Sequence, residues 1–218
     1  MRKIFRLALF AVVFGLAAPA AAEYEAGVTA YRQGDYALAL REWRPLAEAG
    51  EAGAEAGLAN MYRAGLGVAQ DSGEALKWYQ KAAGQGHTLA QYNLGLIFAN
   101  GRLVAQDLGE ALRWYREAAN QGFVLAQYNL AHMYDEGLGV ARDDAEAVRW
   151  YGKAAAQGMA LAQYTLGLMY DDGQGVAEDH AVAAKWYGEA ARQGATHRPS
   201  IISGSCTPWA RGWRARRC

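Results

Sequence analysis

The chain has few of the residues that build disulfide frameworks, metal sites or membrane spans. Only two of its 218 residues are cysteine, Cys206 and Cys218, and both lie near the C-terminus. A disulfide between them would close only a small loop, and two cysteines without nearby histidine pairs fall short of the four ligands of a zinc site. No apolar run after residue 22 reaches the roughly 20 residues that a transmembrane helix needs, so we expect no membrane span in the mature chain.

Basic residues are also scarce in most of the chain. Residues 23–194 carry 14 basic and 22 acidic side chains, whereas residues 195–218 carry five basic side chains and no acidic one. A protein that binds nucleic acid needs a basic face for the phosphates, so the acidic body argues against a nucleic-acid partner. We expect the basic tail, residues 195–218, to be irregular. Contact of the tail with anionic lipid and an altered reading frame are alternative interpretations.

The first 22 residues have the pattern of a secretory signal peptide. Three basic residues precede an apolar segment, residues 7–18, and an Ala-x-Ala cleavage site ends at Ala22. The apolar segment is too short to span a bilayer, although an uncleaved membrane anchor is the alternative interpretation. We therefore expect export to the periplasm or secretion, with a mature chain that begins at Glu23.

The sequence does contain one segment that is repeated several times. The segment LRWYREAANQG, residues 112–122, has near copies at residues 76–86, 148–158 and 184–194. Trp43 and the tryptophans of these four copies are separated by 35, 36, 36 and 36 residues. A fixed period of this length is the signature of a helical solenoid, in which each unit buries the faces of its neighbours.

Each unit contains the signals of two helices. An aspartate precedes the Trp-Tyr segment where an N-cap belongs, and a Gln-Gly pair follows where a helix ends. Between them, Ala75, Trp78, Tyr79, Ala82 and Ala83 have the spacing of one helical stripe, and a second stripe follows in LAQYNLG. The expected N-caps are Asp71, Asp107, Asp143 and Asp179. We therefore predict an all-α fold, an α-solenoid of antiparallel helix pairs with a 36-residue repeat.

The repeat also predicts how the chain is divided. Residues 1–22 form the signal peptide, residues 23–34 an N-terminal capping helix, residues 35–194 a solenoid of four units and a half, and residues 195–218 the tail. The loops between units carry glycine at positions 67, 139 and 175, but the loop of the second unit carries Leu103 there. We expect that loop to take a different turn.

This pattern resembles the Sel-one-like repeat family, relatives of the tetratricopeptide repeats with slightly longer units. The matching text is DLGEALRWYREAANQGFVLAQYNLAHMYDEGLGVARD, residues 107–143, and the resemblance covers about residues 35–194. It implies an α-solenoid that binds other proteins as an adaptor or assembly factor, in exported members often within envelope complexes. Some cysteine-rich members are linked to penicillin binding or hydrolysis, whereas the units here contain no cysteine. The alternative is a cell-wall or β-lactam-acting hydrolase, or a glycan-binding protein, of the same family.

No group of residues has the spacing of an active site. The histidines occupy different positions of the repeat and are interpreted as surface or packing residues: His87, His132, His180 and His197. Acid pairs before the loop glycines, at 135–136 and 171–172, could attract a divalent cation or a basic partner. They lack the ordered oxygen ligands of a calcium loop and are interpreted as solvated loops. We expect no catalytic residues, no cofactor and no metal, and therefore no enzyme.

One charged feature recurs on the Trp-Tyr helices. A basic residue precedes each tryptophan, at Lys77, Arg113, Arg149 and Lys185. In the first three units a glutamate three residues earlier can form a weak intrahelical pair with it. Ordinary surface charge is one interpretation of this ladder. The resemblance implies that the first helix of each unit, taken here as the Trp-Tyr helix, lines a concave binding face. The residues predicted to contact a protein partner are Lys77, Lys81, Arg113, Glu117, Arg149 and Lys153.

Overall fold

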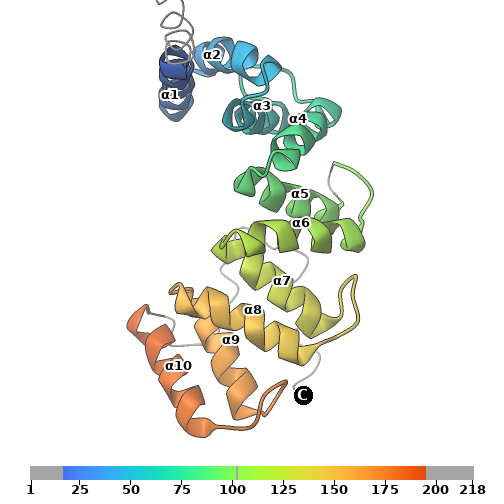
Figure 1. Ribbon diagram of the computed structural model, residues 1–218, viewed down its shortest axis with the longest axis vertical. Coiled ribbons are helices and arrows are strands. Elements are labelled where there is room, and N and C mark those ends of the chain that lie inside the picture. Colours follow the sequence, from blue (N-terminus) through green and yellow to red (C-terminus); the bar gives the residue numbers. More distant parts are fainter. Residues whose placement is uncertain (1–16, 102, 195–218) are drawn as a thin grey trace, which may run out of the picture. The chain divides into compact units, whose positions relative to one another are not determined.

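A computed structural model describes residues 17–101 and 103–194, and these residues form ten α-helices and no strand (Figure 1). The helices are α1 (Ala17–Gln33), α2 (Tyr36–Glu48), α3 (Ala52–Ala64), α4 (Ser72–Gly84), α5 (Thr88–Asn100), α6 (Leu108–Asn120), α7 (Val124–Glu136), α8 (Asp144–Ala156), α9 (Ala160–Asp171) and α10 (His180–Arg192). The predicted all-α solenoid is confirmed. Most of the predicted signal peptide, and the whole basic tail, lie outside the described residues.

The chain divides into two compact parts, residues 1–90 and residues 91–218. In the N-terminal part, α1 packs on α2, α2 on α3 and α3 on α4. In the C-terminal part, α6, α7, α8, α9 and α10 pack successively, each on the next. The contacts of α7 with α8 and of α9 with α10 are more extensive than those of α6 with α7 and of α8 with α9. None of the described helices has the length and apolar character that a bilayer crossing requires.

The ends of the Trp-Tyr helices lie where the sequence signals predict. Each predicted aspartate is an N-cap whose carboxylate accepts a hydrogen bond from a backbone N–H of the first turn: Asp71, Asp107, Asp143 and Asp179. The C-cap of each helix is a glutamine, and the glycine after it has a positive φ between 82° and 88°. The N-cap and C-terminal predictions are therefore confirmed, because both signals act locally on the backbone.

The predicted apolar stripe forms the core. In α4, all five stripe residues are buried, and the equivalent residues of α6 and α8 are buried in the same way. Glycines allow the tyrosines to pack closely. A Cβ added to Gly95 would lie 2.5 Å from the ring of Tyr115, and one added to Gly167 would lie 2.7 Å from the ring of Tyr187. Side chains larger than glycine at these two positions would push the neighbouring helices apart.

Trp43 differs from the later tryptophans, which explains the shorter first interval. It lies eight residues after the N-cap Asp35, whereas Trp78 lies seven after its N-cap and Tyr79 eight. Trp43 therefore occupies the position of the tyrosine in the Trp-Tyr pair. Its indole Nε1 donates to the carbonyl oxygen of Tyr24 in α1 at 3.2 Å, and the two rings stack with centroids 6.3 Å apart. In this way α1 covers the end of the array.

The loop that carries Leu103 has a different backbone conformation from the glycine loops, as the sequence predicts. Gly139 and Gly175 have φ values of 69° and 68°, and no described residue other than glycine has a positive φ. A Cβ at Gly139 would lie 2.6 Å from the carbonyl oxygen of Leu108, at the start of α6. These loops therefore need glycine both for the left-handed backbone and for the close approach to an earlier helix.

Candidate protein-interaction surface

The six residues predicted to contact a partner lie on three helices, and all six are exposed. Lys77 and Lys81 belong to α4 in the N-terminal part of the chain. In the C-terminal part, α6 carries Arg113 and Glu117, and α8 carries Arg149 and Lys153. Within each pair the two side chains are one helical turn apart, so they project from the same side of their helix.

Glutamates of the same helix hold three of the cations, as the spacing predicts. Glu74 pairs with Lys77 at 2.9 Å, Glu110 with Arg113 at 2.6 Å, and Glu146 with Arg149 at 2.7 Å. These side chains are about half exposed, so each pair contributes only a few tenths of a kcal/mol to stability. The pairs position the cations more than they hold the fold together.

Cations of these helices also cover the tryptophan rings, a feature that the sequence analysis missed. The ammonium of Lys81 lies 4.2 Å from the ring centroid of Trp78, and that of Lys153 lies 3.9 Å from the centroid of Trp150. The guanidinium of Arg113 lies 3.9 Å from the ring centroid of Trp114. The signal was visible in the sequence as a basic residue one before or three after each tryptophan. Because the cation sits over the ring face, part of its charge is balanced by the aromatic quadrupole.

A second repeated contact ties the two helices of each pair together. The glutamine of every Gln-Gly pair donates a hydrogen bond from its side-chain amide to a buried residue 30 positions earlier. The four bonds are Gln85 to Glu55 at 2.7 Å, Gln121 to Gln91 at 2.7 Å, Gln157 to Gln127 at 2.8 Å and Gln193 to Gln163 at 3.0 Å. Both glutamines recur in the sequence, but only the structure shows that they meet. The acceptors are buried, so the bonds satisfy groups that water cannot reach.

Glu55 stands out because a carboxyl group replaces the amide that the other three repeats bury. Only 2% of Glu55 is exposed. Burial raises the pKa of this carboxyl, while the hydrogen bond from Gln85 and the charge of Lys81 act in the opposite direction. The surroundings of Glu55 therefore favour the charged form of its carboxyl less than water does.

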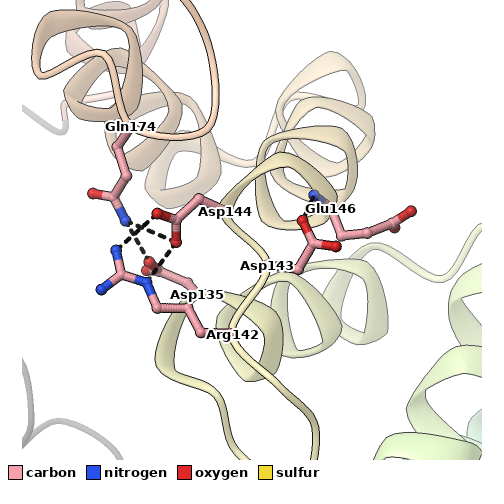
Figure 2. A network of polar contacts seen from close by, with 6 residues as sticks. All are labelled: Asp135, Arg142, Asp143, Asp144, Glu146 and Gln174. Atoms are coloured by element: carbon pink, nitrogen blue, oxygen red, sulfur yellow. Dashed lines mark hydrogen bonds and ion pairs between the residues drawn. The ribbon is translucent and has the colours of Figure 1, made fainter.

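A polar network links α7 to the loop before α10 (Figure 2). The side-chain amide of Gln174 donates to Asp135 at 2.8 Å and lies 3.4 Å from Asp144. Arg142 donates from Nε and Nη2 to the two carboxylate oxygens of Asp144, at 2.7 and 2.9 Å. In Figure 2, the side chain of Gln174 reaches down from its loop toward both aspartates. The network joins neighbouring repeats rather than forming an open site.

The interpretation of the first acid pair as a solvated loop is wrong for Asp135. This residue is only 8% exposed, because it lies inside the last turn of α7 rather than in the loop. Burial raises the pKa of Asp135, followed by the charges of Glu136 and Asp144, while Arg142 and Gln174 lower it. The sequence does not show which acid pair is buried and which is exposed, because both pairs precede a glycine in the same way.

The remaining acids and histidines form local contacts. His180 lies between Asp171, 2.9 Å from Nδ1, and Glu178, 3.1 Å from Nε2, on the surface. His87 Nδ1 accepts a hydrogen bond from the backbone N–H of Ala90 at 3.2 Å, and burial lowers the pKa of His87, which favours the neutral ring that can accept. Within residues 17–101 and 103–194, no three His, Cys, Asp or Glu side chains are grouped as metal ligands would be. His197 lies outside the described residues.

Comparison with protein families gives the repeat a name. The family model of the Sel1 repeat matches residues 52–87, 88–123, 124–159 and 160–194. The chain belongs to the Sel1 repeat family. Proteins of this family are helical scaffolds that generally mediate protein–protein interactions and are generally not enzymes.

Solved structures of Sel1 repeat proteins resemble this one. One from Oxalobacter formigenes is 33% identical, over 78% of this chain and 70% of its own, with a TM-score of 0.76. The protein c5321, a protective antigen of uropathogenic Escherichia coli strains with an SLR fold, is 43% identical, with a TM-score of 0.68. That match covers 71% of this chain and 33% of c5321, so this chain spans about a third of its length. No curated protein matched the chain.

The phase of the Sel1 repeat bears on the predicted surface. Each repeat begins with α3, α5, α7 or α9, so the Trp-Tyr helices are the second helices of their repeats. The prediction that the six charged residues line a concave face assumes that the Trp-Tyr helices are the first helices of their units. In the Sel1 repeat they are the second helices, so the prediction of partner contact depends on exposure and charge alone.

The first helices expose two leucines that the sequence analysis missed. Leu89 in α5 is 44% exposed and Leu125 in α7 is 45% exposed, and they occupy the same position of successive repeats. Each directly precedes the buried Ala-Gln of its helix, outside the predicted apolar stripe. Their position outside the apolar stripe of the helix is the feature of the sequence from which their exposure could have been predicted.

Proposed function

We propose that this Sel1 repeat protein is an exported scaffold that binds a protein partner of an envelope complex, as an adaptor or assembly factor. The observation that carries the proposal is the set of exposed charges over buried tryptophans, built in the same way on α4, α6 and α8. The partner would contact Lys77, Lys81, Arg113, Glu117, Arg149 and Lys153.

The packing of these cations supports a role in binding. Free lysine and arginine side chains lose rotamer freedom when a partner immobilises them, which costs up to about 1.5 kcal/mol each. Here an indole ring and, for Arg113 and Arg149, a bidentate or short ion pair already restrain the side chain. A partner carboxylate can then bind the outer edge of the guanidinium with a smaller entropic cost.

The charge pattern supplies selectivity. Counted over the six residues and the glutamates that pair with them, α4 and α8 each present two cations and one glutamate, whereas α6 presents one cation and two glutamates, Glu110 and Glu117. A partner that matches this pattern needs charges of both signs. Complementary charges of this kind set the choice of partner and the rate of association more than the affinity.

Site-specific photocrosslinking in the native envelope tests the proposed surface. A photoreactive residue at Arg113 or Lys153 should give a protein adduct of defined mass, and the charge-reversed variant Arg113→Glu/Arg149→Glu should lose it. The matched control is Ala145, an exposed residue of α8 outside the charged set. Adducts at Leu125 but not at Arg113 or Lys153 would place the partner on the first helices and refute the charged surface.

Export has a separate test. The contacts that α1 makes with Trp43 come from Tyr24, Gly27 and Tyr31, all after the proposed cleavage point. Removal of residues 1–22 should therefore leave them intact. N-terminal sequencing of chain recovered from the periplasm or medium should begin at Glu23. A chain that stays in the cytoplasm with Met1 retained would contradict export.

An enzymatic role remains testable by activity. Turnover of a chromogenic β-lactam by the purified chain, abolished by one point substitution, would favour the hydrolase alternative over the scaffold.

A further inference from the structure

In the C-terminal part of the chain, a buried glutamine joins a first helix to the helix before it and to the helix after it. The side-chain amide of Gln127 in α7 donates to the carbonyl oxygen of Ala119 in α6 at 3.2 Å, and that of Gln163 in α9 donates to Ala155 in α8 at 3.0 Å. The side-chain oxygen of each glutamine accepts from the glutamine 30 positions later. Each of these glutamines therefore acts both as a donor and as an acceptor.

Glu55 occupies the equivalent position in the N-terminal part, and Ala47 occupies the position of Ala119. Ala47 stands eight residues before Glu55, as Ala119 stands eight residues before Gln127. Both alanines are buried near the end of their helices. The carbonyl oxygen of each accepts from the backbone N–H of the glycine three residues later, at 3.0 Å in both cases. The ends of α2 and α6 therefore present the same carbonyl group to the helix that follows.

The ionised carboxyl group of Glu55 can make only one half of this pattern. It accepts a hydrogen bond from Gln85 at 2.7 Å, as the glutamines accept theirs. A carboxylate has no hydrogen to donate, whereas a protonated carboxyl has one O–H donor and can still accept. A bond to Ala47, equivalent to the bond from Gln127 to Ala119, is therefore open only to the protonated form of Glu55.

This bond would act across the least extensive of the three helix contacts in the N-terminal part. α2 contacts α3 less extensively than α1 contacts α2 or α3 contacts α4. Trp43 packs on Gly57 across the contact of α2 with α3, since a Cβ added to Gly57 would lie 2.6 Å from the indole ring. That packing involves no titrating group. The attachment of the α1–α2 pair is therefore the property that a proton on Glu55 can change.

The groups around Glu55 favour the protonated form more than water does. Burial raises the pKa of Glu55, and the charge of Glu51, the N-cap of α3, acts in the same direction. The hydrogen bond from Gln85 and the charge of Lys81, both contributed by the α4 side, act against them. The buried residues of α2 carry no charge. The form that can donate to Ala47 is thus the form that this environment supports.

We propose that Glu55 is a proton-dependent latch of the first helix pair: its protonated carboxyl donates to the carbonyl oxygen of Ala47 and holds α2 on α3, and its carboxylate lacks this bond. The stability that the latch adds is fully present below the ordinary pKa of a glutamate and is lost as the pH rises through the raised one. Acid therefore tightens the N-terminal end of the array, and local opening of α1 and α2 becomes easier as the pH rises. The latch does not depend on whether the charged residues bind a partner.

Amide hydrogen exchange of the full-length chain tests the latch. Glu55→Gln is compared with wild type at each pH, so that the titration of other groups cancels. The glutamine can donate at every pH, so at pH 7 the amides of α1 and α2 should be about fivefold or more better protected than in wild type, the effect of one hydrogen bond. At pH 4, below the ordinary pKa of a glutamate, the two chains should be equally protected.

Gly57→Ala is the matched control. It weakens the same contact of α2 with α3 by steric overlap with Trp43, so its loss of protection should be the same at both pH values.

Two further measurements separate the hydrogen bond from the effect of burial. In a chain with ¹³C-labelled alanine, the carbonyl signal of Ala47 should move between pH 7 and pH 4 in wild type and stay in place in Glu55→Gln. Gln127→Glu should transfer the latch to the C-terminal part. Relative to wild type, it should lower the protection of the α6 amides about fivefold or more at pH 7 and much less at pH 4.

An effect of Glu55→Gln that is equal at the two pH values would overturn the proposal. So would an Ala47 carbonyl signal that responds to pH in the same way with and without Glu55, because burial alone would then account for the pH dependence. An equal loss of α6 protection at both pH values in Gln127→Glu would also overturn it, since a carboxyl at this position of the repeat would then not act as a proton-dependent donor.

Discussion

Replacement of Trp114 by alanine should be among the most destabilising single changes in this chain. Trp114 is only 9% exposed, and a buried tryptophan removes about 150–250 Å² from water, so the transfer alone is worth about 4–6 kcal/mol as an upper bound. Its Nε1 has no hydrogen-bond partner among the described residues, so the substitution removes no hydrogen bond. Loss of the Arg113 contact adds less than about 1 kcal/mol. We expect a loss of about 3–5 kcal/mol.

Trp186→Ala is the matched control, because Trp186 occupies the same position of the motif but is only partly buried. It should cost less than half as much. Urea unfolding of both variants, followed by circular dichroism in the helical region, gives the two free energies. Repeat arrays can unfold in more than one step, so amide exchange in α6 and α7 should confirm where Trp114→Ala opens the fold. Equal losses, or a loss below about 1 kcal/mol for Trp114→Ala, would refute the reasoning that neighbouring repeats bury these rings.

The other predictions concern single positions. Burial raises the pKa of Glu55, so the unfolding free energy falls as the pH rises from the ordinary pKa of a glutamate to the raised one. Glu55→Gln should therefore stabilise the chain at pH 7 and make its urea midpoint depend less on pH between acid and neutral pH. Equal pH profiles of the variant and the wild type would contradict this. Gly152 lies in the middle of α8 with open space around an added Cβ, so Gly152→Ala should raise the unfolding free energy by about 0.5–1 kcal/mol. Gly139 has a positive φ, so Gly139→Ala should lower the unfolding free energy. Thermal melts that rank the two variants in the opposite order would contradict this difference in backbone conformation. Gln174→Leu leaves the buried Asp135 without its amide donor and should cost about 1–3 kcal/mol in urea unfolding, a loss that Asp135→Leu in the same chain should largely remove.

Much of the fold could be predicted because its signals are local. The four aspartate N-caps, the glycines after the helices and the stripe that begins at Ala75 each act within one helix. The all-α solenoid then followed from the 36-residue period alone. The different turn at Leu103 was also predictable, since a leucine cannot readily take the positive φ of Gly139.

The candidate surface was predicted less completely. The exposure of Arg113 and its pair with Glu110 followed from helical spacing, but its position over Trp114 depends on a rotamer that packing selects. The phase of the repeat was also ambiguous, because a strict period does not show where a unit begins. The exposed Leu125 was missed because the prediction of the surface considered only the Trp-Tyr helices, whereas Leu125 belongs to the helix that begins a Sel1 repeat.

The sequence by itself determined the helices, their caps and the period, since these depend on neighbours within a few residues along the chain. Only the tertiary structure decided that Trp43 packs under α1, that Asp135 is buried while Asp171 is not, and that Ala191 is exposed where Ala155 is covered. Each of these residues stands in a local sequence like that of its counterpart. What separates them is which other part of the described chain packs against that side: α1 on Trp43, Gln174 of the loop before α10 on Asp135, and α9 beside Ala155. That is a property of the folded array and not of the local sequence.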